Sequence, residues 1–219
     1  MSFITSEGGL TRAGYVLFVI LALVAFIIGA IIAGRATQKK KMRPKQLVFC
    51  AMGLALAFAL SYIRIIHLPY GGAATLLSML MIVLVAYWYG PATGVLVGFA
   101  YGILQFIQEP YFLSVLQVCM DYLFAFSALG LAGFFRKKKN GLVIGYIVAV
   151  LARGFFHAVG GYMFWMEYMP DNFPKSLSAI YPIVYNYSFL LTEALITVIV
   201  ISIPSVKNAL ARVQKMALE

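Results

Sequence analysis

Seven long apolar runs constrain the fold of this chain more than any other feature of its sequence. A backbone that crosses lipid must satisfy its hydrogen bonds within the segment, so apolar runs of about 20 residues favour transmembrane helices. Only 11% of the residues are charged, whereas about a quarter are charged in soluble domains. We therefore expect an all-α integral membrane protein with spans at residues 14–34, 46–66, 74–89, 91–108, 112–135, 141–165 and 180–204.

Positive charge in the loops predicts how these spans are oriented. The net charge is +10, and most of the 17 Lys and Arg residues lie in three clusters, at residues 35–45, 136–139 and 207–215. If every apolar run spans the membrane, the three clusters lie on one side, and loops rich in Lys and Arg are typical of the cytoplasmic side. The pattern predicts a multi-pass protein with its N-terminus outside and its C-terminus in the cytoplasm.

The basic run KKKMRPK, at residues 39–45, divides the chain into two parts. Residues 1–45 hold an extra N-terminal transmembrane helix and a basic cytoplasmic linker, and residues 46–219 hold a unit of six helices. No GxxxxGK[ST] phosphate loop is present, so an ATPase that drove transport would lie on another chain. Cys50 and Cys119 lack the spacing of metal ligands or a redox pair, and we expect neither a disulfide nor a metal site.

Four of the ionisable residues within the predicted spans bear on function, because a charge there is costly unless it is paired or hydrated. They are Asp121, Arg153, His157 and Glu193. A helical rise of 1.5 Å per residue puts Asp121 and His157 at a similar depth below the outer boundary. Aromatic walls with a few placed polar groups are what a small-molecule pocket requires, and the outer half of the spans supplies more of both, at Tyr111, Tyr122, Trp165, Tyr181 and Asn186.

In the sixth run, Arg153, His157, Gly161 and Trp165 recur every four residues and therefore share one helix face. Trp165 taken alone would equally suit an interfacial anchor. The pair of Gly160 and Gly161 leaves room beside the stripe for a ligand ring or for the close approach of a neighbouring helix.

Arg153 could form an internal ion pair with Asp121, or it could pair with Glu193, which lies closer to its depth. If Arg153 pairs mainly with Glu193, Asp121 is free for a cationic ligand, which nearby aromatic faces would attract further by cation–π interaction. We therefore expect an aromatic, positively charged, water-soluble small molecule as the ligand.

Three stretches between residues 46 and 204 resemble the thiamine-binding S components of energy-coupling factor (ECF) transporters. One, at 109–137, reads EPYFLSVLQVCMDYLFAFSALGLAGFFRK and is similar to the acid-tyrosine helix of that family. Another, LARGFFHAVGGYMFW at 151–165, is similar to its basic-x-x-x-His helix with a Trp eight residues on. The last, IYPIVYNYSF at 180–189, keeps its Tyr-x4-Asn spacing.

This resemblance implies a six-helix bundle in a bacterial plasma membrane, with a thiamine site near the outer face. It implies that Asp121 engages the positively charged ligand and that Trp165 stacks on a thiamine ring. Arg153 matches a basic residue, usually lysine, with a structural or electrostatic role. The other implied site residues line or close the pocket; they are Tyr111, Tyr122, His157, Tyr181 and Asn186. No cofactor is implied besides thiamine as the transported ligand.

The resemblance also implies partners, because an S component docks on a transmembrane coupling subunit that carries two cytoplasmic ATPases. In that superfamily, docking uses an Ala-x-x-x-Ala pattern on the first helix of the six. The stretch AMGLALAFAL (51–60) offers Gly53 and Ala57, or Ala51, Ala55 and Ala59, and such small residues let another helix approach closely. The loop LPYGGAATL (68–76) is the expected gate, because its glycines permit large backbone changes.

Two positions depart from the family pattern. The family acid is usually glutamate, and Asp121 is one methylene shorter, so the ligand must lie closer to this helix or bind less tightly. A tryptophan of the first outer loop is replaced by Gly72 or a neighbour.

Three alternatives for the ligand and the activity stay open. The same architecture could take a thiamine precursor or another vitamin, and an intramembrane enzyme could in principle use Asp121, Arg153 and His157 as acids and bases. No metal-ligand cluster or nucleophile beside a base supports an enzyme. The few basic groups expected at the outer mouth, Arg64, His67 and Lys175, favour unphosphorylated thiamine.

Overall fold

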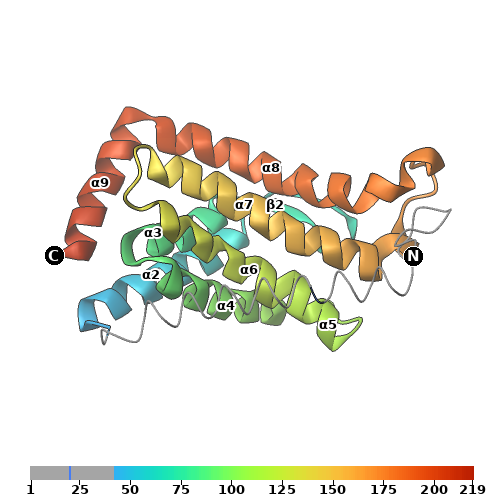
Figure 1. Ribbon diagram of the computed structural model, residues 1–219, viewed down its shortest axis with the longest axis horizontal. Coiled ribbons are helices and arrows are strands. Elements are labelled where there is room, and N and C mark those ends of the chain that lie inside the picture. The colour runs from blue at the N-terminus through green and yellow to red at the C-terminus, as the bar shows by residue number, and fades with distance from the viewer. Residues whose placement is uncertain (1–19, 21–41) are drawn as a thin grey trace.

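The computed structural model describes residue 20 and residues 42–219 of the chain. In this part the chain folds into a bundle of elongated helices, with α7 and α8 running side by side along most of its length (Figure 1). The predicted span at 14–34 lies, apart from residue 20, outside the described residues. The regular helices of the bundle are α2 (Pro44–Ser61), α3 (Ser78–Tyr89), α4 (Pro91–Gln108), α7 (Gly141–Gly160) and α8 (Tyr181–Ser202).

The fifth span of the chain is a continuous rod built from four short segments. They are α5 (Val115–Val118), the π-helix η2 (Cys119–Phe124), α6 (Ala125–Ser127) and the 3₁₀-helix η3 (Ala128–Phe135). The outer end of α7 likewise continues into the π-helix η4 (Gly161–Trp165) and then the 3₁₀-helix η5 (Met166–Tyr168), and η6 (Lys175–Ile180) leads into α8. π-Helical segments interrupt α-helices rarely and occur mostly at functional sites.

The described part has the helices that an all-α membrane protein needs. Five helical segments are long and apolar enough to cross a membrane, and α3, with 12 residues, is a shorter apolar helix. The predicted tight turn between α3 and α4 is confirmed, since Gly90 adopts a left-handed φ of 97° and Pro91 begins the next helix. Together these helices confirm the predicted class of all-α multi-pass membrane protein.

A β-hairpin follows α2, so the predicted helix 46–66 exists but its C-terminal end was predicted five residues too late. The helix ends at Ser61, and strands β1 (Arg64–His67) and β2 (Ala73–Thr75) pair antiparallel around the short turn η1 (Pro69–Gly71). Ile63, Ile65 and Ile66 are apolar enough to extend a helical reading, but β-branched residues favour strands. The turn needs left-handed backbone at Tyr70 and Gly71, which a helix cannot supply.

Glycines let the fifth span lie directly on α4 with no side chain between the two backbones. A Cβ on Gly98 would lie 2.3 Å from the carbonyl oxygen of Phe126, and one on Gly130 would lie 2.3 Å from the backbone nitrogen of Val95. Real side chains essentially never come this close. The half of the bundle that contains these contacts, called the inner half, is therefore held by backbone-to-backbone packing.

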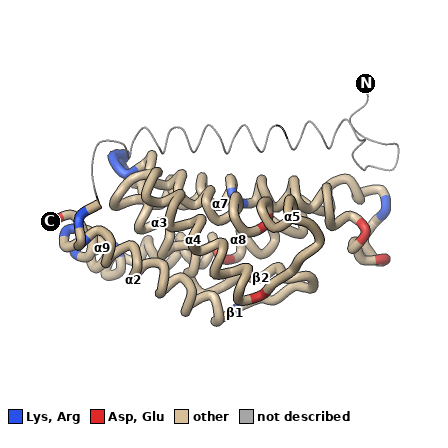
Figure 2. Tube along the Cα trace, turned by 90° about the horizontal axis from the view of Figure 1, so that it is seen from below, with Lys and Arg blue, Asp and Glu red and all other residues tan. Residues whose placement is uncertain are grey.

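A helix that the apolar runs did not predict, α9 (Pro204–Leu218), crosses one end of the bundle (Figure 1). Leu210, Val213 and Ala217 pack against the core, and the Tyr89 hydroxyl donates to the Ala217 carbonyl at 2.9 Å. Most of the Lys and Arg residues gather at this same end (Figure 2). The described members of the predicted basic clusters thus share one end of the molecule.

Candidate functional site

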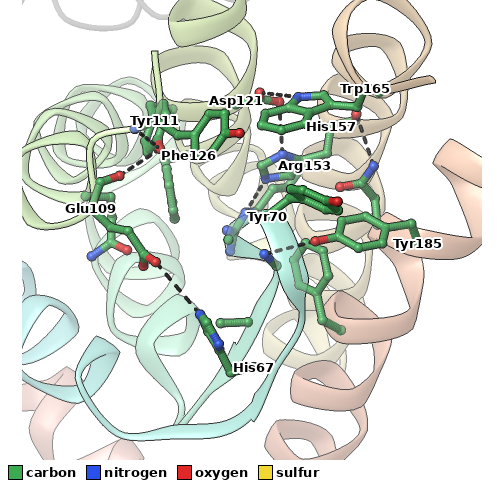
Figure 3. A pocket seen from close by; sticks show the side chains of 18 of the residues that line it. His67, Tyr70, Glu109, Tyr111, Asp121, Phe126, Arg153, His157, Trp165 and Tyr185 are labelled. Carbon is green, nitrogen blue, oxygen red and sulfur yellow. Dashed lines mark hydrogen bonds and ion pairs between the residues drawn. The ribbon is translucent and has the colours of Figure 1, made fainter. Parts of the chain in front are cut away.

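A cavity of about 330 Å³ opens in the half of the bundle remote from α9 (Figure 3). Its walls come from the hairpin, the fifth span, the α7–η5 segment and α8. The volume falls within the range of about 300–1,000 Å³ that is typical of small-molecule sites. All eight residues predicted to bind the ligand line this one cavity: Tyr111, Asp121, Tyr122, Arg153, His157, Trp165, Tyr181 and Asn186.

The carboxylate of Asp121 is held by donors from three directions. Gln117 Nε2 donates to Oδ2 at 2.8 Å and the indole Nε1 of Trp165 donates to the same oxygen at 3.1 Å. His157 Nδ1 lies 3.4 Å from Oδ1, so the predicted common depth of Asp121 and His157 is confirmed. No Lys or Arg in the described part of the chain forms an ion pair with Asp121.

Arg153 does not pair with Glu193, and that prediction was wrong. Its Nε donates to His157 Nε2 at 3.3 Å, and its guanidinium carbon lies 4.1 Å from the centre of the Phe126 ring. Glu193 instead accepts hydrogen bonds from the junction of β2 and α3. A hairpin that the apolar pattern did not reveal brought backbone donors closer to Glu193 than Arg153 is.

The contacts of Arg153 decide the tautomer of His157. Because Nε2 accepts from the guanidinium, a neutral ring carries its proton on Nδ1 and donates it to Asp121; this assignment comes from the hydrogen bonds. Arg153, His157 and Asp121 are thus joined by two consecutive hydrogen bonds.

Trp165 lies at the centre of an aromatic cage that closes the outer end of the cavity. Its ring centre is 4.8 Å from that of Tyr111, 5.3 Å from that of Tyr168 and 6.3 Å from that of Tyr70. Tyr70, at the hairpin tip, was missed by the sequence reasoning. It lies two residues before Gly72, where the family tryptophan was judged replaced, so the gate loop retains an aromatic ring.

The α8 wall joins the cavity to both α7 and the hairpin. Asn186 Nδ2 donates to the carbonyl oxygens of His157 at 3.2 Å and Pro182 at 2.8 Å. Tyr181 is 7% exposed and packs between Phe173 and Tyr185.

Two lining residues on neighbouring elements were also missed. The hydroxyl of Tyr185 accepts from the backbone N–H of Gly72 at 3.2 Å and donates to the carbonyl of Pro69, so it holds the hairpin tip. Gln117 lies one turn before Asp121, and its position on the same helix face could have revealed it.

Tyr122 shapes the cavity mainly by holding the loop before the fifth span. Its hydroxyl donates to the Glu109 carbonyl at 2.9 Å and accepts from the Tyr111 backbone N–H at 3.3 Å. The ring packs edge-on against Phe106, with the ring centres 5.2 Å apart. Tyr122 therefore positions Tyr111 under Trp165.

The two glycines of the α7–η4 junction serve close packing. A Cβ on Gly160 would lie 2.8 Å from Asp121 Oδ1, and a Cβ on Gly161 would lie 2.6 Å from the Cβ of Pro182. Close approach of neighbouring elements, one of the two alternatives for this pair, is thus observed and lets Asp121 reach His157, while Gly161 also lines the cavity.

The predicted docking residues on α2 separate into two groups. Gly53 and Ala57 are buried and face the bundle, with Val85 Cγ2 only 2.6 Å from a Cβ built on Gly53. They are therefore unavailable as an outer surface. Ala51 and Ala55 are exposed on the opposite face of α2, which leaves them as the candidates for docking.

The family model described as "Thiamine transporter protein (Thia_YuaJ)" matches residues 47–212. The chain belongs to this thiamine transporter family. It is 27% identical over 155 residues to the thiamine transporter ThiT of Bacillus subtilis, across 62% of this chain and 76% of that protein. Its fold is similar to a solved structure of ThiT from Listeria monocytogenes, with a TM-score of 0.58 and 24% identity over 73% of this chain and 94% of that one.

Family membership confirms the resemblance that the three sequence stretches indicated. The matched range contains every predicted site residue and begins after the predicted extra helix. Because the family and the Bacillus relative are transporters, the alternative of an intramembrane enzyme is set aside.

Proposed function

We propose that this protein is the substrate-binding subunit of an ECF-type ABC transporter. It captures thiamine from outside and delivers it inward when docked on a coupling module with ATPases. The observation that supports this most is the contact between the Asp121 carboxylate and the Trp165 indole inside the cavity. A ligand that is both cationic and aromatic is recognised by those two groups together.

Thiamine binding would use the cavity in a definite way. Its cationic ring lies within reach of Asp121 and faces the cage of tyrosines, since charge and aromatic faces both attract a cation. An aromatic ring of the ligand packs on Trp165 inside the cage, and the rings of Tyr70 and Tyr111 close over it. Ligand entry therefore requires Tyr70 and the hairpin tip to move aside.

The mouth of the cavity supports a preference for thiamine over its phosphate esters. Arg64 Nη2 lies 2.6 Å from Glu109 Oε2, and His67 Nε2 lies 3.8 Å from Glu109 Oε1. The Glu109 carboxylate thus contacts both basic side chains of the hairpin, Arg64 and His67, which would otherwise attract a phosphate. The third predicted basic residue, Lys175, is exposed on η6.

The partner, orientation and domain predictions belong to the same proposal. The exposed face of α2, with Ala51 and Ala55, would receive a transmembrane coupling subunit, and two cytoplasmic ATPases would drive transport. The basic end with α9 would face the cytoplasm, as the distribution of Lys and Arg favours. Residues 1–45 would supply an extra N-terminal transmembrane helix and a basic cytoplasmic linker, with the N-terminus outside.

Tryptophan fluorescence tests the ligand directly, because the chain has two tryptophans. Trp88 packs on Phe49, with ring centres 6.0 Å apart, and does not line the cavity. Thiamine should quench the emission of purified protein, and Trp165→Ala should keep the Trp88 emission but lose the quenching. No response at high micromolar thiamine in the wild-type protein would overturn the ligand assignment.

Two further measurements separate the remaining alternatives. Titration with the isolated pyrimidine and thiazole halves tests the precursor alternative, since whole thiamine should bind more tightly than either half. Co-expression with a coupling subunit and its ATPases tests the partner. We expect co-purification and ATP-dependent thiamine uptake into proteoliposomes, and Ala51→Trp or Ala55→Trp should reduce both without reducing thiamine binding in detergent.

A further inference from the structure

Glu193 is a buried carboxylate on α8 whose contacts the ligand site does not explain. It is 2% exposed and does not line the cavity. Oε2 accepts from the backbone N–H of Thr75 at 2.9 Å and from its hydroxyl at 2.7 Å, and Oε1 accepts from the backbone N–H of Met79 at 3.1 Å. Every one of these donors lies where the hairpin ends and α3 begins.

Glu193 acts as a helix cap that comes from another helix. Residue Leu77, at the start of α3, has a left-handed φ of 62° and no capping side chain of its own. The first N–H groups of any helix lack intrahelical partners, and a negative charge near them is favourable. Here the carboxylate of α8 accepts from Met79 N–H, so the beginning of α3 depends on a residue more than 100 positions away.

The capped junction also forms part of the cavity floor. Thr75 and Ser78 line the cavity, and their hydroxyl oxygens are 2.6 Å apart. Since the Thr75 hydroxyl donates to Glu193, the Ser78 hydroxyl can donate to Thr75 or, at 3.5 Å, to Glu193 Oε1. The position of both cavity hydroxyls therefore follows from Glu193.

The two ends of the hairpin are held by unequal contacts. The inner end has a buried carboxylate with two backbone donors and two hydroxyl donors, those of Thr75 and, at 3.5 Å, of Ser78. The tip is held mainly by the phenol of Tyr185 and by ring contacts of Tyr70, which is 45% exposed. The inner end is thus much harder to displace than the tip.

We propose that Glu193 is a positioning residue that anchors the inner end of the hairpin, so that only the tip opens when the ligand enters or leaves. The inference rests on the proposed function, because the ligand is taken to be thiamine. It assigns Glu193 a role in retention of the ligand without any contact to the ligand.

Glu193→Gln is the sharpest variant, because it keeps the shape and removes acceptors. A carboxamide has one acceptor oxygen and one NH₂ group, whereas the two carboxylate oxygens each face a backbone N–H. The NH₂ group must therefore face the N–H of either Thr75 or Met79, and that donor loses its partner. Hydroxyl groups can rotate to compensate, but a backbone N–H cannot.

Hydrogen exchange of the ligand-free protein measures the anchor by itself. In Glu193→Gln, exchange in peptides covering residues 73–80 should rise about tenfold to a hundredfold, as expected when a hydrogen bond to a charged group is lost. Exchange in α4 and α7 should stay unchanged. A uniform rise throughout the bundle, or no rise at 73–80, would overturn the proposal.

Stopped-flow tryptophan fluorescence measures the consequence for the ligand. We expect the rate of thiamine release to rise by about tenfold in Glu193→Gln while the association rate changes less, because loss of a restraint acts mainly on dissociation. Equal release rates in the variant and the wild type would overturn the retention role.

Thr197→Val is the matched control. Thr197 lies one turn further along α8, is fully buried and accepts from the Tyr146 hydroxyl at 3.0 Å, and among the described residues no hydrogen bond joins its side chain to the hairpin. It should leave both exchange at 73–80 and thiamine release at wild-type values. If Thr197→Val accelerated release as much as Glu193→Gln, any buried polar loss on α8 would suffice and the anchor would be refuted.

A double-mutant cycle that combines Glu193→Gln with Thr75→Val measures the interaction between these two residues. Thr75→Val removes the hydroxyl donor and keeps the backbone donor, so its own effect should be smaller than that of Glu193→Gln. The two effects should not add, because the residues share one interaction; full additivity would contradict the anchor.

The hydrogen-exchange experiment needs no ligand. An absence of thiamine binding in the wild type would therefore refute the proposed function and leave the anchor tested on its own.

Discussion

The inner and outer halves of this bundle bring helices together by different means, although glycine packing also occurs in the outer half, where a Cβ on Gly102 would lie 2.4 Å from the Tyr122 carbonyl oxygen. In the inner half, α4 meets the fifth span through Gly98, Gly130 and Gly133, whose missing side chains let backbone touch backbone. In the outer half, the fifth span and the end of α7 become π-helical and meet through polar side chains, with Asp121 bonded to His157 and Trp165. The outer half also holds the cavity that the predicted site residues line.

The difference explains how a small membrane protein can hold a polar site. Packing without side chains between backbones is insensitive to what happens in the cavity, so it keeps the helices in register. Polar residues of the outer half satisfy one another across elements, which compensates the cost of placing them within a membrane span. Substitutions in the inner half should therefore destabilise the fold, whereas substitutions in the outer half should weaken ligand binding.

The largest effect is expected from Gly98→Val in the inner half. A Cβ there lies 2.3 Å from the carbonyl oxygen of Phe126, and overpacking against backbone should cost about 3 kcal/mol, the upper end of the usual range. We expect a clearly lower midpoint of thermal unfolding in detergent, as measured by fluorescence-detected size-exclusion chromatography. Leu96→Phe, at a side chain that is 57% exposed on the same helix, should keep the wild-type midpoint; an unchanged midpoint in Gly98→Val would show that α4 and the fifth span are not rigidly packed.

Asp121→Asn should have the next largest effect, and it should act on affinity rather than stability. The amide keeps the shape and loses the charge, so thiamine should bind about tenfold to a hundredfold more weakly, as for a charge-assisted hydrogen bond of about 1.5–3 kcal/mol. Isothermal titration calorimetry measures this. Asp121→Glu keeps the charge and should bind more tightly than Asp121→Asn; equal affinity of the wild type and Asp121→Asn would exclude charge recognition at this position.

Tyr70→Ala should have a smaller effect, confined to the hairpin tip. The ring contacts Trp165 and Tyr168, and an aromatic pair contributes about 0.5–1.5 kcal/mol beyond its buried area, which corresponds to a release rate about threefold to tenfold faster. Tyr70→Phe keeps the ring and should release thiamine at the wild-type rate. Stopped-flow fluorescence distinguishes the two, and identical rates in Tyr70→Ala and the wild type would show that the tip does not retain the ligand.

The smallest effect is expected from Glu109→Gln at the cavity mouth. The ion pair with Arg64 is partly exposed, at 29% and 46% of the side chains, and such pairs contribute about 0–1 kcal/mol. Thiamine affinity should change by less than about fivefold, while thiamine monophosphate should gain affinity at low salt because Arg64 becomes available. The gain should shrink as salt rises, and a phosphate ester that gains nothing would contradict the role given to Glu109.

Much of the fold could be predicted because lipid leaves few alternatives to helices. The spans 91–108 and 141–165 were close to their observed bounds, and the Gly90–Pro91 turn followed from local backbone preferences. The hairpin could not be predicted from hydropathy, since its isoleucines are as apolar as those of a helix. The amphipathic α9 was overlooked for the opposite reason, because its mean hydropathy is too low for a span.

Much of the site could be predicted as well, since depth along a helix follows from residue count. That argument placed Asp121 and His157 at one level, and the eight predicted residues line one cavity. Rotation about the helix axis is harder to predict, because each π-helical turn shifts the face of every later residue. The partner of Arg153 was predicted wrongly for a related reason, since it depended on a hairpin whose position was unknown.

The amino-acid sequence by itself determined the class of protein, the approximate spans, the one-sided basic clusters and the kinds of side chain at the site. Those properties follow from the cost of exposing polar groups to lipid, which acts on each segment separately. Only the tertiary structure decided which donors meet Asp121 and Glu193, and which small residues of α2 face outward. Such contacts depend on how separate elements are rotated and packed, and no single segment carries that information.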